Sequence, residues 1–417
     1  MAYAHAHMKL LRTVVLLSAA AAVASLSAQA PASAPPQSPQ LTDEGKARLT
    51  VQMNGAVKLG YAPAIVEIVV NREGVLYRGA AGLAANTIFN IASMTKPVTS
   101  VAIMMLAEQG KLKIDDPVSK YLDGYDTLQV ITKFNAADGS YETRPAKTVM
   151  TIKHLLAHTS GIGYSFTNPI EYALVSKTQK GEWELPLLDD PGTKFNYSAS
   201  TRVLGFIVEK VTGSPLEPWY QQHIFTPLGM VDTSWAVAAG KQARLAPQFT
   251  RASGKIEPLP AATVPTTPTP PFRGDGGLYS TVDDYAKFVR MLLNDGTLGS
   301  ARILSPASVK LMGQNAMESI FVELQPDANK ERTKPFPLGA GKDKFGLGFQ
   351  IAADDPATKG YRSPGSMSWA GIYNTEFWVD PVKKIGAVHM MQLLPFYDDG
   401  AIRALRGFEQ TVYKELK

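Results

Sequence analysis

The sequence contains no cysteine, which excludes disulfide bonds, thiolate nucleophiles and cysteine-ligated metal sites. It also excludes a lipid anchor on an N-terminal cysteine. The chain has 417 residues, of which 45% are hydrophobic, and this is enough to build a large core without disulfide bonds.

Other absences narrow the possible functions. The formal net charge is only +5 and there is no long basic run, so we expect no nucleic-acid partner. No glycine-rich phosphate loop is present, and we expect no cofactor. The pattern G-x-S-x-G is also missing, which argues against an α/β-hydrolase.

Two histidines have the spacing of metal ligands. His154 and His158 lie four residues apart on a short helix expected from Thr151 to His158. No glutamate follows His154, as the zinc-protease pattern would require. We therefore expect a capping or packing role for these residues and no metal site.

Residues 1–30 have the pattern of an export signal. A short basic region precedes the uncharged apolar run Thr13–Leu26, and Ala28-Gln29-Ala30 is a candidate cleavage site. The alternative is a retained anchor, but the run is short for a transmembrane helix. Residues 31–40 have the composition of a flexible leader. We expect a periplasmic or secreted protein with no stable membrane anchor after cleavage.

Strand patterns cluster at both ends of the remaining chain, and helical patterns fill the middle. We expect an α+β fold in which both ends share an antiparallel sheet flanked by the first and last helices. We expect residues 41–417 to form one domain, with a sheet lobe of about 41–115 and 340–417 and a mainly helical lobe of about 116–339. The expected strands are Ala64–Val70, Val75–Ala81, Gly346–Ile351, Tyr373–Val379 and Ile385–Met391.

Two stretches between these elements have a loop-like composition. Residues 123–148 are polar, and we expect them to form no strand or helix. Residues 256–271 hold six prolines and are expected to be extended, either over a cleft or as a surface connection.

A serine and a lysine lie three residues apart in Ser93-Met94-Thr95-Lys96, at the start of a helix expected from Ile91 to Gly110. Positions i and i+3 share one face of a helix, so Ser93 and Lys96 would lie side by side. Pro97 is tolerated only in the first turn, where the helix dipole favours negative charge. The pair is a candidate activated nucleophile, and the alternative is a capping serine followed by a surface lysine.

Several further motifs follow in an order that resembles one known superfamily. The sequence resembles the β-lactamase-like serine hydrolases, which include class C β-lactamases, DD-peptidases and family VIII carboxylesterases. The resemblance covers most of residues 45–415 and implies a β-lactamase/transpeptidase-like fold. The motifs that carry it are Ser93–Lys96, His154–Gly161, Pro191–Ser198, Gly276–Thr281 and Trp369–Gly371.

The resemblance implies a second catalytic residue, Tyr197, in Tyr197-Ser198-Ala199, where Ala199 replaces the usual asparagine. Ser93 becomes a good nucleophile only when a base takes its proton, and the pKa of that base must lie near the working pH. A neutral, desolvated Lys96 could take the proton directly, with Tyr197 as relay to the leaving group. Alternatively, a charged Lys96 could lower the pKa of Tyr197 and make a phenolate base. The sequence leaves both open.

The resemblance also implies a third element, Trp369-Ala370-Gly371, which we expect to open a strand at the edge of the site. The small residues Ala370 and Gly371 would let substrate lie against this strand. The backbone N–H groups of Ser93 and Ile372 would stabilise the oxyanion.

Trp369 has no cation to hold a substrate carboxylate, whereas β-lactamases and peptidases have a lysine or histidine at this motif. We therefore expect a carboxylesterase that acts on small-molecule esters of short to medium chain length. A β-lactamase or D-amino-acid peptidase is the alternative, with Arg273 or Arg362 as a carboxylate partner if either faces the cleft. A non-catalytic binding relative is a third possibility, but it predicts loss of catalytic residues that are present here.

Overall fold

The computed structural model describes residues 38–417, which form one compact unit beginning at Ser38. The expected signal at residues 1–30 and most of the leader at residues 31–40 lie outside the described residues. Among the helices of the described part, none is long and apolar enough to cross a bilayer.

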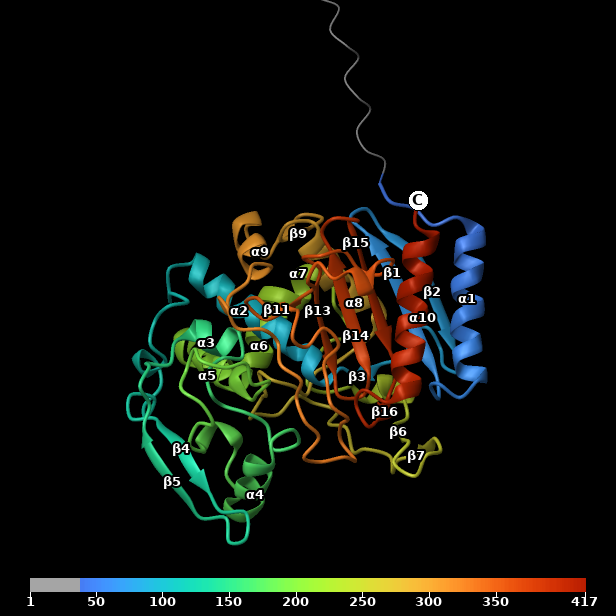
Figure 1. Cartoon of the computed structure of the whole chain (residues 1–417). Helices are drawn as coiled ribbons and strands as arrows, with labels where there is room; N and C mark the ends of the chain where they lie inside the picture. Colours follow the sequence, from blue (N-terminus) through green and yellow to red (C-terminus); the bar gives the residue numbers. More distant parts are fainter. Residues whose placement is uncertain (1–37) are drawn as a thin grey trace, which may run out of the picture. The chain divides into compact units, whose positions relative to one another are not determined.

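A seven-stranded antiparallel sheet joins the two ends of the chain, as expected (Figure 1). Strand β1 pairs with β15 over the register from Val66–Met390 to Asn71–Ile385. The α+β fold class is therefore confirmed. In sheet order the strands are β11 (Lys344–Phe345), β12 (Gln350–Ile351), β13 (Met367–Gly371), β14 (Thr375–Asp380), β15 (Ile385–Met390), β1 (Ile65–Asn71) and β2 (Val75–Ala81).

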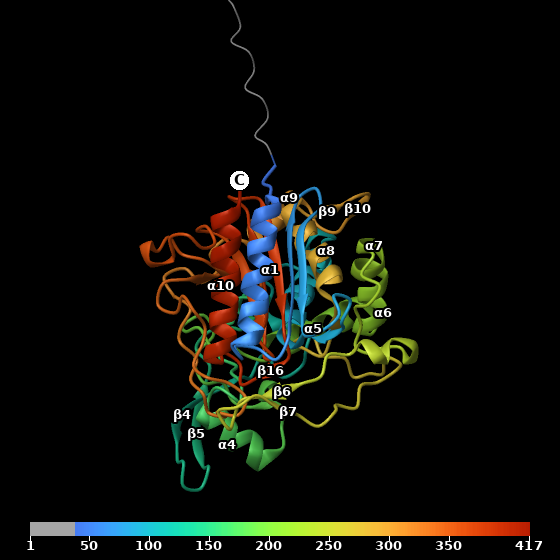
Figure 2. The ribbon, with the colours of Figure 1, turned by 90° about the vertical axis from the view of Figure 1, so that its right-hand side faces the viewer.

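Helices cover both faces of this sheet. On one face, α1 (Asp43–Lys58) and α10 (Asp399–Glu415) lie side by side (Figure 2). On the other face, α8 (Val282–Leu293) packs against β1, β14 and β15. Alternate residues of β1 serve the two layers, since Val69 packs with the α1–α10 side and Ile68 with the α8 side.

The helix ends follow local rules. The Thr42 side chain accepts a hydrogen bond from Gly45 N, and Thr281 caps α8 in the same way through Asp284 N. The two ends of the compact unit also meet, because Gln40 and Lys417 exchange two backbone hydrogen bonds of 3.0 Å. Leu41 and Leu416 form a bridge beside them.

The middle of the chain is mainly helical. Helix α2 (Thr95–Glu108) is almost entirely buried and packs against α5 (Ser200–Thr212). Helix α8 belongs by sequence to residues 116–339, which were expected to form the helical lobe. In the structure it packs on the sheet instead. The other helices are α3 (Ile152–Leu156), α4 (Pro169–Thr178), α6 (Leu216–Tyr220), α7 (Thr226–Leu228) and α9 (Pro306–Met312).

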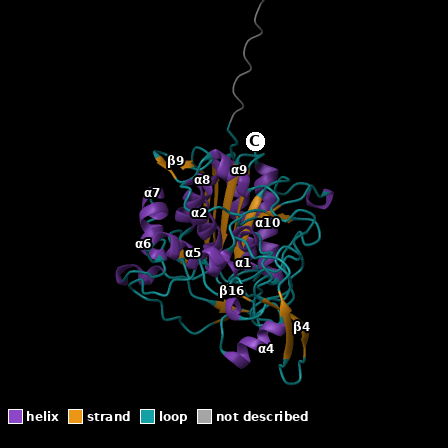
Figure 3. Cartoon of the chain, turned by 90° about the vertical axis from the view of Figure 1, so that its left-hand side faces the viewer, coloured by secondary structure: helices purple, strands orange, loops and turns teal. Residues whose placement is uncertain are grey.

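The expectation of a structureless loop at residues 123–148 is wrong. Strands β4 (Gln129–Phe134) and β5 (Tyr141–Pro145) form a hairpin there, beside α4 in the view of Figure 3. β5 is exposed along most of its length and β4 buries only Val130, so the sustained hydrophobic alternation of a half-buried strand is missing. The remaining short strands are β3 (Phe89–Asn90), β6 (Phe249–Thr250), β7 (Glu257–Pro258), β8 (Tyr279–Ser280), β9 (Thr297–Leu298), β10 (Ala301–Arg302) and β16 (Leu393–Leu394).

Candidate active site

Ser93 lies in the 3-10 turn Ala92–Met94, directly before α2. The expected helix therefore starts as a tighter turn. Ala92 has a φ of 42°, in the left-handed region that costs a residue with a side chain about 1–2 kcal/mol. Its N–H donates to Asn90 Oδ1 over 3.0 Å, which helps to hold this conformation. Strained residues persist only where the surrounding structure holds them in place. They are often found at functional sites.

Lys96 lies one turn after Ser93 and is only 2% exposed. Its Nζ is 3.1 Å from Ser93 Oγ, 2.9 Å from the Tyr164 hydroxyl and 2.8 Å from the Asp275 carbonyl oxygen. Burial lowers the pKa of Lys96 to about 7, with Asp275 opposing this shift and Arg273 supporting it. The amine is therefore neutral in a large fraction of molecules at neutral pH.

The three contacts of Lys96 suit the neutral amine. A neutral amine has two N–H donors and one lone pair. The donors match the Asp275 carbonyl and the Tyr164 hydroxyl, whose own proton goes to Asp275 Oδ2 over 2.6 Å. In the neutral amine the lone pair can accept the hydroxyl proton of Ser93, whereas a charged Lys96 would donate to all three oxygens.

The buried carboxylate of Asp275 organises the cationic side of the site. It accepts hydrogen bonds from Arg202 Nε over 2.8 Å and from Arg273 Nη2 over 3.2 Å. Burial by itself raises the pKa of Asp275, but the charges of Arg273, Lys96 and Arg202 outweigh this and hold the pKa below its ordinary value. The carboxylate therefore stays ionised beside Lys96.

Sequence reasoning missed Tyr164, Arg202 and Asp275 as members of this site. Asp275 carried a usable signal, since it is an acidic residue enclosed by glycines in the stretch Gly274-Asp275-Gly276-Gly277. A Cβ on Gly274 would lie 2.6 Å from the Thr201 carbonyl oxygen, so the turn approaches α5 too closely for a side chain. Tyr164 and Arg202 had no local signal.

Tyr197 lies with Ser93 and Lys96, as the motif order predicted. Its side chain is 3% exposed, and Lys96 Nζ is 4.9 Å from its ring centroid. Its ring packs against those of Trp369 and His158, with centroids 4.9 and 5.0 Å away. Burial raises the pKa of Tyr197, so its phenol is protonated at neutral pH.

The triplet Trp369-Ala370-Gly371 ends β13, which corrects the expectation that it opens a strand. The next residues turn sharply into β14, and Gly371–Thr375 is the last ladder pair. A Cβ on Gly371 would lie 2.4 Å from the carbonyl oxygen of Ile91. Glycine therefore lets the strand end lie directly against the Ser93 turn. Ile372 follows beyond the last ladder pair.

Ser93 faces a cleft of about 730 Å³. Ile372 also lines this cleft, together with Arg273, Arg332 and Trp183. A small recess of about 10 Å³ adjoins Ser93, and the residues that line it are mostly apolar: Phe166, Tyr197, Phe336, Trp369, Ala370, Gly371, Ile372 and Phe396. All the expected site residues except the buried Lys96 line one of these two spaces.

Of the two arginines considered for a substrate carboxylate, only Arg273 lines the cleft. Arg362 lies in a separate cavity, where its Nε is 2.9 Å from Glu409 Oε1. The proline-rich residues 256–271 are largely exposed and are not among the cleft residues, so they form a surface connection.

The two histidines have structural partners. Thr151 N donates to His154 Nδ1 over 3.2 Å while Thr151 Oγ1 accepts from His154 N over 3.4 Å, which caps α3. His158 is buried, and its Nδ1 is 3.0 Å from Ser198 Oγ. Within residues 38–417, no group of three or more metal-binding side chains could hold a metal ion.

The fold and the site together define the β-lactamase-like serine hydrolase superfamily. A family model described as Beta-lactamase matches residues 54–411, and the chain therefore belongs to the beta-lactamase family.

Relatives in this family carry different names. Protein Rv1367c of Mycobacterium tuberculosis is 34% identical over 341 residues, covering 77% of this chain and 81% of its own. Monacolin J acid methylbutanoyltransferase of Aspergillus terreus is 29% identical over 361 residues, covering 80% and 83%. Esterase EstB of Burkholderia gladioli is 27% identical over 376 residues, covering 80% and 87%.

A solved structure shares the arrangement of the whole fold. The LovD9 mutant of simvastatin synthase from Aspergillus terreus has a TM-score of 0.75 and 26% identity, covering 89% of this chain and 98% of that chain. Esterases and acyltransferases therefore stand among the relatives of this chain.

Proposed function

We propose that the protein is a serine hydrolase that forms an acyl-enzyme on Ser93 and acts as a carboxylesterase on esters of short to medium chain length. The observation that carries this proposal is the contact of 3.1 Å between Ser93 Oγ and the buried Lys96 Nζ. A buried lysine with a pKa of about 7 is matched to proton transfer at neutral pH.

Acylation begins with neutral Lys96 as general base. As Ser93 Oγ attacks the ester carbonyl carbon, its proton moves to Lys96 Nζ and the carbonyl oxygen becomes an oxyanion. The backbone N–H groups of Ser93 and Ile372 donate to this oxyanion. When the C–O bond breaks, the leaving alkoxide takes a proton from Tyr197, which regains one from Lys96.

Deacylation reverses these roles with water as the nucleophile. Lys96 and Tyr197 take a proton from the water as its oxygen attacks the acyl carbon of the ester on Ser93. The second oxyanion collapses, the bond to Ser93 Oγ breaks, and Ser93 regains its proton. A carboxylic acid leaves, and the starting state of the site is restored.

Two features favour esters over β-lactams. Trp369 stands where a β-lactamase would have a cationic residue, and its ring packs on Tyr197. The side chains that line the recess beside Ser93 are mostly apolar, which suits a neutral ester better than a charged substrate. Arg273 lines the cleft, but it is engaged with Asp275.

Acyl transfer to an alcohol is a second candidate. The cleft of about 730 Å³ is far larger than the recess, so it has room for an alcohol acceptor beside a small acyl group on Ser93. A relative that is named a methylbutanoyltransferase supports the same reaction type. In this case the alcohol takes the place of water in the second half-reaction.

The test measures ester turnover by the purified protein. It should hydrolyse p-nitrophenyl acetate and butyrate, and Ser93→Ala should remove this activity. A fluorophosphonate should label the wild-type protein on Ser93, as located by peptide mass spectrometry. Added alcohols should divert the acyl group to new esters if acyl transfer operates.

Two outcomes would contradict the carboxylesterase. Turnover of a chromogenic cephalosporin far above that of esters would favour a β-lactamase. No turnover of either substrate, together with no labelling of Ser93, would favour a non-catalytic binding protein.

A further inference from the structure

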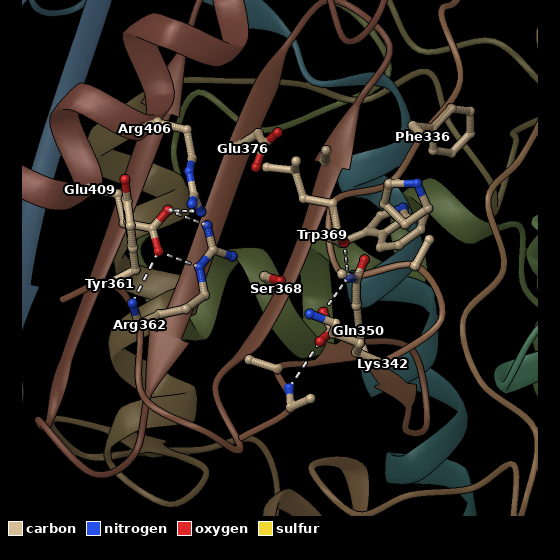
Figure 4. A pocket seen from close by; sticks show the side chains of 18 of the residues that line it. Phe336, Lys342, Gln350, Tyr361, Arg362, Ser368, Trp369, Glu376, Arg406 and Glu409 are labelled. Carbon is tan, nitrogen blue, oxygen red and sulfur yellow. Dashed lines mark hydrogen bonds and ion pairs between the residues drawn. The ribbon is translucent and has the colours of Figure 1, made fainter. Parts of the chain in front are cut away.

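A second cavity, which Ser93 does not line, lies beside β13 and β14 (Figure 4). Its volume is about 250 Å³. Ser368 and Glu376 reach it from β13 and β14, and Arg406 and Glu409 reach it from α10. Tyr361 and the segment around Lys342 also line it.

Most of the charged side chains that line this cavity already have partners. Arg362 Nε lies 2.9 Å from Glu409 Oε1, and Arg406 Nη1 lies 3.9 Å from Glu409 Oε2. Lys342 Nζ lies 2.6 Å from Asp355 Oδ2. Asp343, which also lines the cavity, accepts a hydrogen bond from Gln350 Nε2 over 2.6 Å.

Glu376 differs from these residues. Its side chain lines the cavity and is 7% exposed, yet no hydrogen bond or ion pair engages its carboxylate within the described part of the chain. Burial raises the pKa of Glu376 to about 7, although the charge of Arg362 acts against this shift. A buried carboxylate without a partner is costly, so a cationic ligand would gain by pairing with it.

The charges lining the cavity lead to the same conclusion. Four carboxylates face three cations, and the cavity is therefore one positive charge short when all are ionised. The carboxylates are Asp343, Asp355, Glu376 and Glu409, and the cations are Lys342, Arg362 and Arg406.

We propose that this cavity is a binding site for a small organic cation, a primary alkylammonium of a few carbons, which pairs with Glu376. The ammonium would supply the missing charge and donate hydrogen bonds to the carboxylate. Phe336, Trp369 and Phe396 provide apolar wall for the alkyl part. The volume of the cavity is somewhat below that of pockets for drug-sized ligands, and this fits a ligand of only a few heavy atoms.

The same three aromatic residues also line the recess beside Ser93. A ligand in the cavity would therefore contact side chains that also line the recess beside Ser93. This link is a consequence of the proposal, and the binding site itself does not depend on the proposed ester hydrolysis.

The test is isothermal titration calorimetry of the full chain with n-butylammonium chloride, and with n-butanol as the neutral probe. We expect n-butylammonium to bind at least roughly tenfold more tightly than n-butanol. Glu376→Gln, which keeps the shape and removes the charge, should abolish this difference. Glu257→Gln, at an exposed position of β7, should leave it unchanged.

Circular dichroism melting shows whether each variant folds. If Glu376→Gln does not fold, Ser368→Val gives a second test, because its methyl groups would occupy part of the cavity and weaken n-butylammonium binding. The proposal is overturned if n-butylammonium binds no better than n-butanol, or if it binds a folded Glu376→Gln variant as tightly as the wild type.

Discussion

At the scale of single residues, the environment of Lys96 distinguishes the two bases proposed for Ser93. Both mechanisms left open by the sequence need one deprotonated group beside Ser93. Burial lowers the pKa of Lys96 to about 7 and raises that of Tyr197 above its ordinary value. Because the same desolvation acts oppositely on an amine and a phenol, it favours the neutral lysine as the base.

A pH profile tests this assignment. Protonated Lys96 cannot accept the proton of Ser93, so kcat/KM for p-nitrophenyl butyrate should rise with pH through about 7 and level off above it. The charge of Arg273 contributes to the lowered pKa of Lys96. Arg273→Gln should therefore move the midpoint to higher pH.

The matched control for this profile is Arg332→Gln, which removes another cation of the cleft. The pH midpoint of its kcat/KM profile should equal that of the wild type. A wild-type midpoint near the ordinary pKa of tyrosine would instead identify Tyr197 as the base.

The apolar side chains next to Ser93 suggest where the preference for acyl chain length is set. Phe166 lines both the recess and the cleft and is only partly buried, so its truncation should cost little stability. Phe166→Ala should shift the optimum from p-nitrophenyl acetate or butyrate towards octanoate. Tyr172→Ala, which alters the cleft and not the recess, should keep the wild-type order. An unchanged order in Phe166→Ala would place the acyl group elsewhere.

At the scale of elements, the important contact is between the end of β13 and the turn before α2. Gly371 lies so close to Ile91 that there is no space for a side chain between them. This contact places Ile372 beside Ser93, although the two are far apart in the sequence. The proposed oxyanion donors therefore depend on how the strand meets the turn.

Gly371→Ala should separate these two elements. The added methyl group would push the strand end away from Ile91, and Ile372 N–H would lose its position. Loss of one oxyanion donor lowers kcat by about a hundredfold or more. Steady-state kinetics should show this fall with the same ester. Gly55→Ala, in open space on α1, should retain the wild-type kcat. A Gly371→Ala variant with wild-type kcat would contradict the role of Ile372.

Local signals explain what could be predicted at this scale. Thr42 and Thr281 cap helices by contacts within three residues, and the pairing of Ser93 with Lys96 follows from helical spacing. Tyr164 and Asp275, which contact Lys96, lie 68 and 179 residues after it in the sequence. A periodic pattern within one element cannot predict contacts over such separations. The β4–β5 hairpin was missed because β5 is exposed along most of its length and β4 buries only Val130, so neither strand has a sustained hydrophobic alternation.

At the scale of the whole molecule, the two ends of the compact unit are hydrogen-bonded to each other. A circular permutant of residues 40–417 tests whether folding depends on the order of the segments. Lys417 would be joined to Gln40 by a short glycine-serine linker, with new ends in the exposed β4–β5 turn at residues 136–138. It should fold and hydrolyse p-nitrophenyl butyrate at a rate near that of the wild type.

The control for the permutant is the unpermuted chain with the same linker inserted at residues 136–138. If the control is active and the permutant does not fold, the order of the segments matters for folding. An inactive control would instead show that the hairpin cannot be altered.

The pairing of β1 with β15 also has a consequence for synthesis. One edge of β1 has no partner until residues 385–390 have been made, about 300 residues later. At ~5–20 residues per second, this interval lasts about 15 to 60 s. An unpaired strand of apolar residues is prone to pair with other chains. The nascent protein therefore passes through a period of exposure to aggregation that its finished sheet does not reveal.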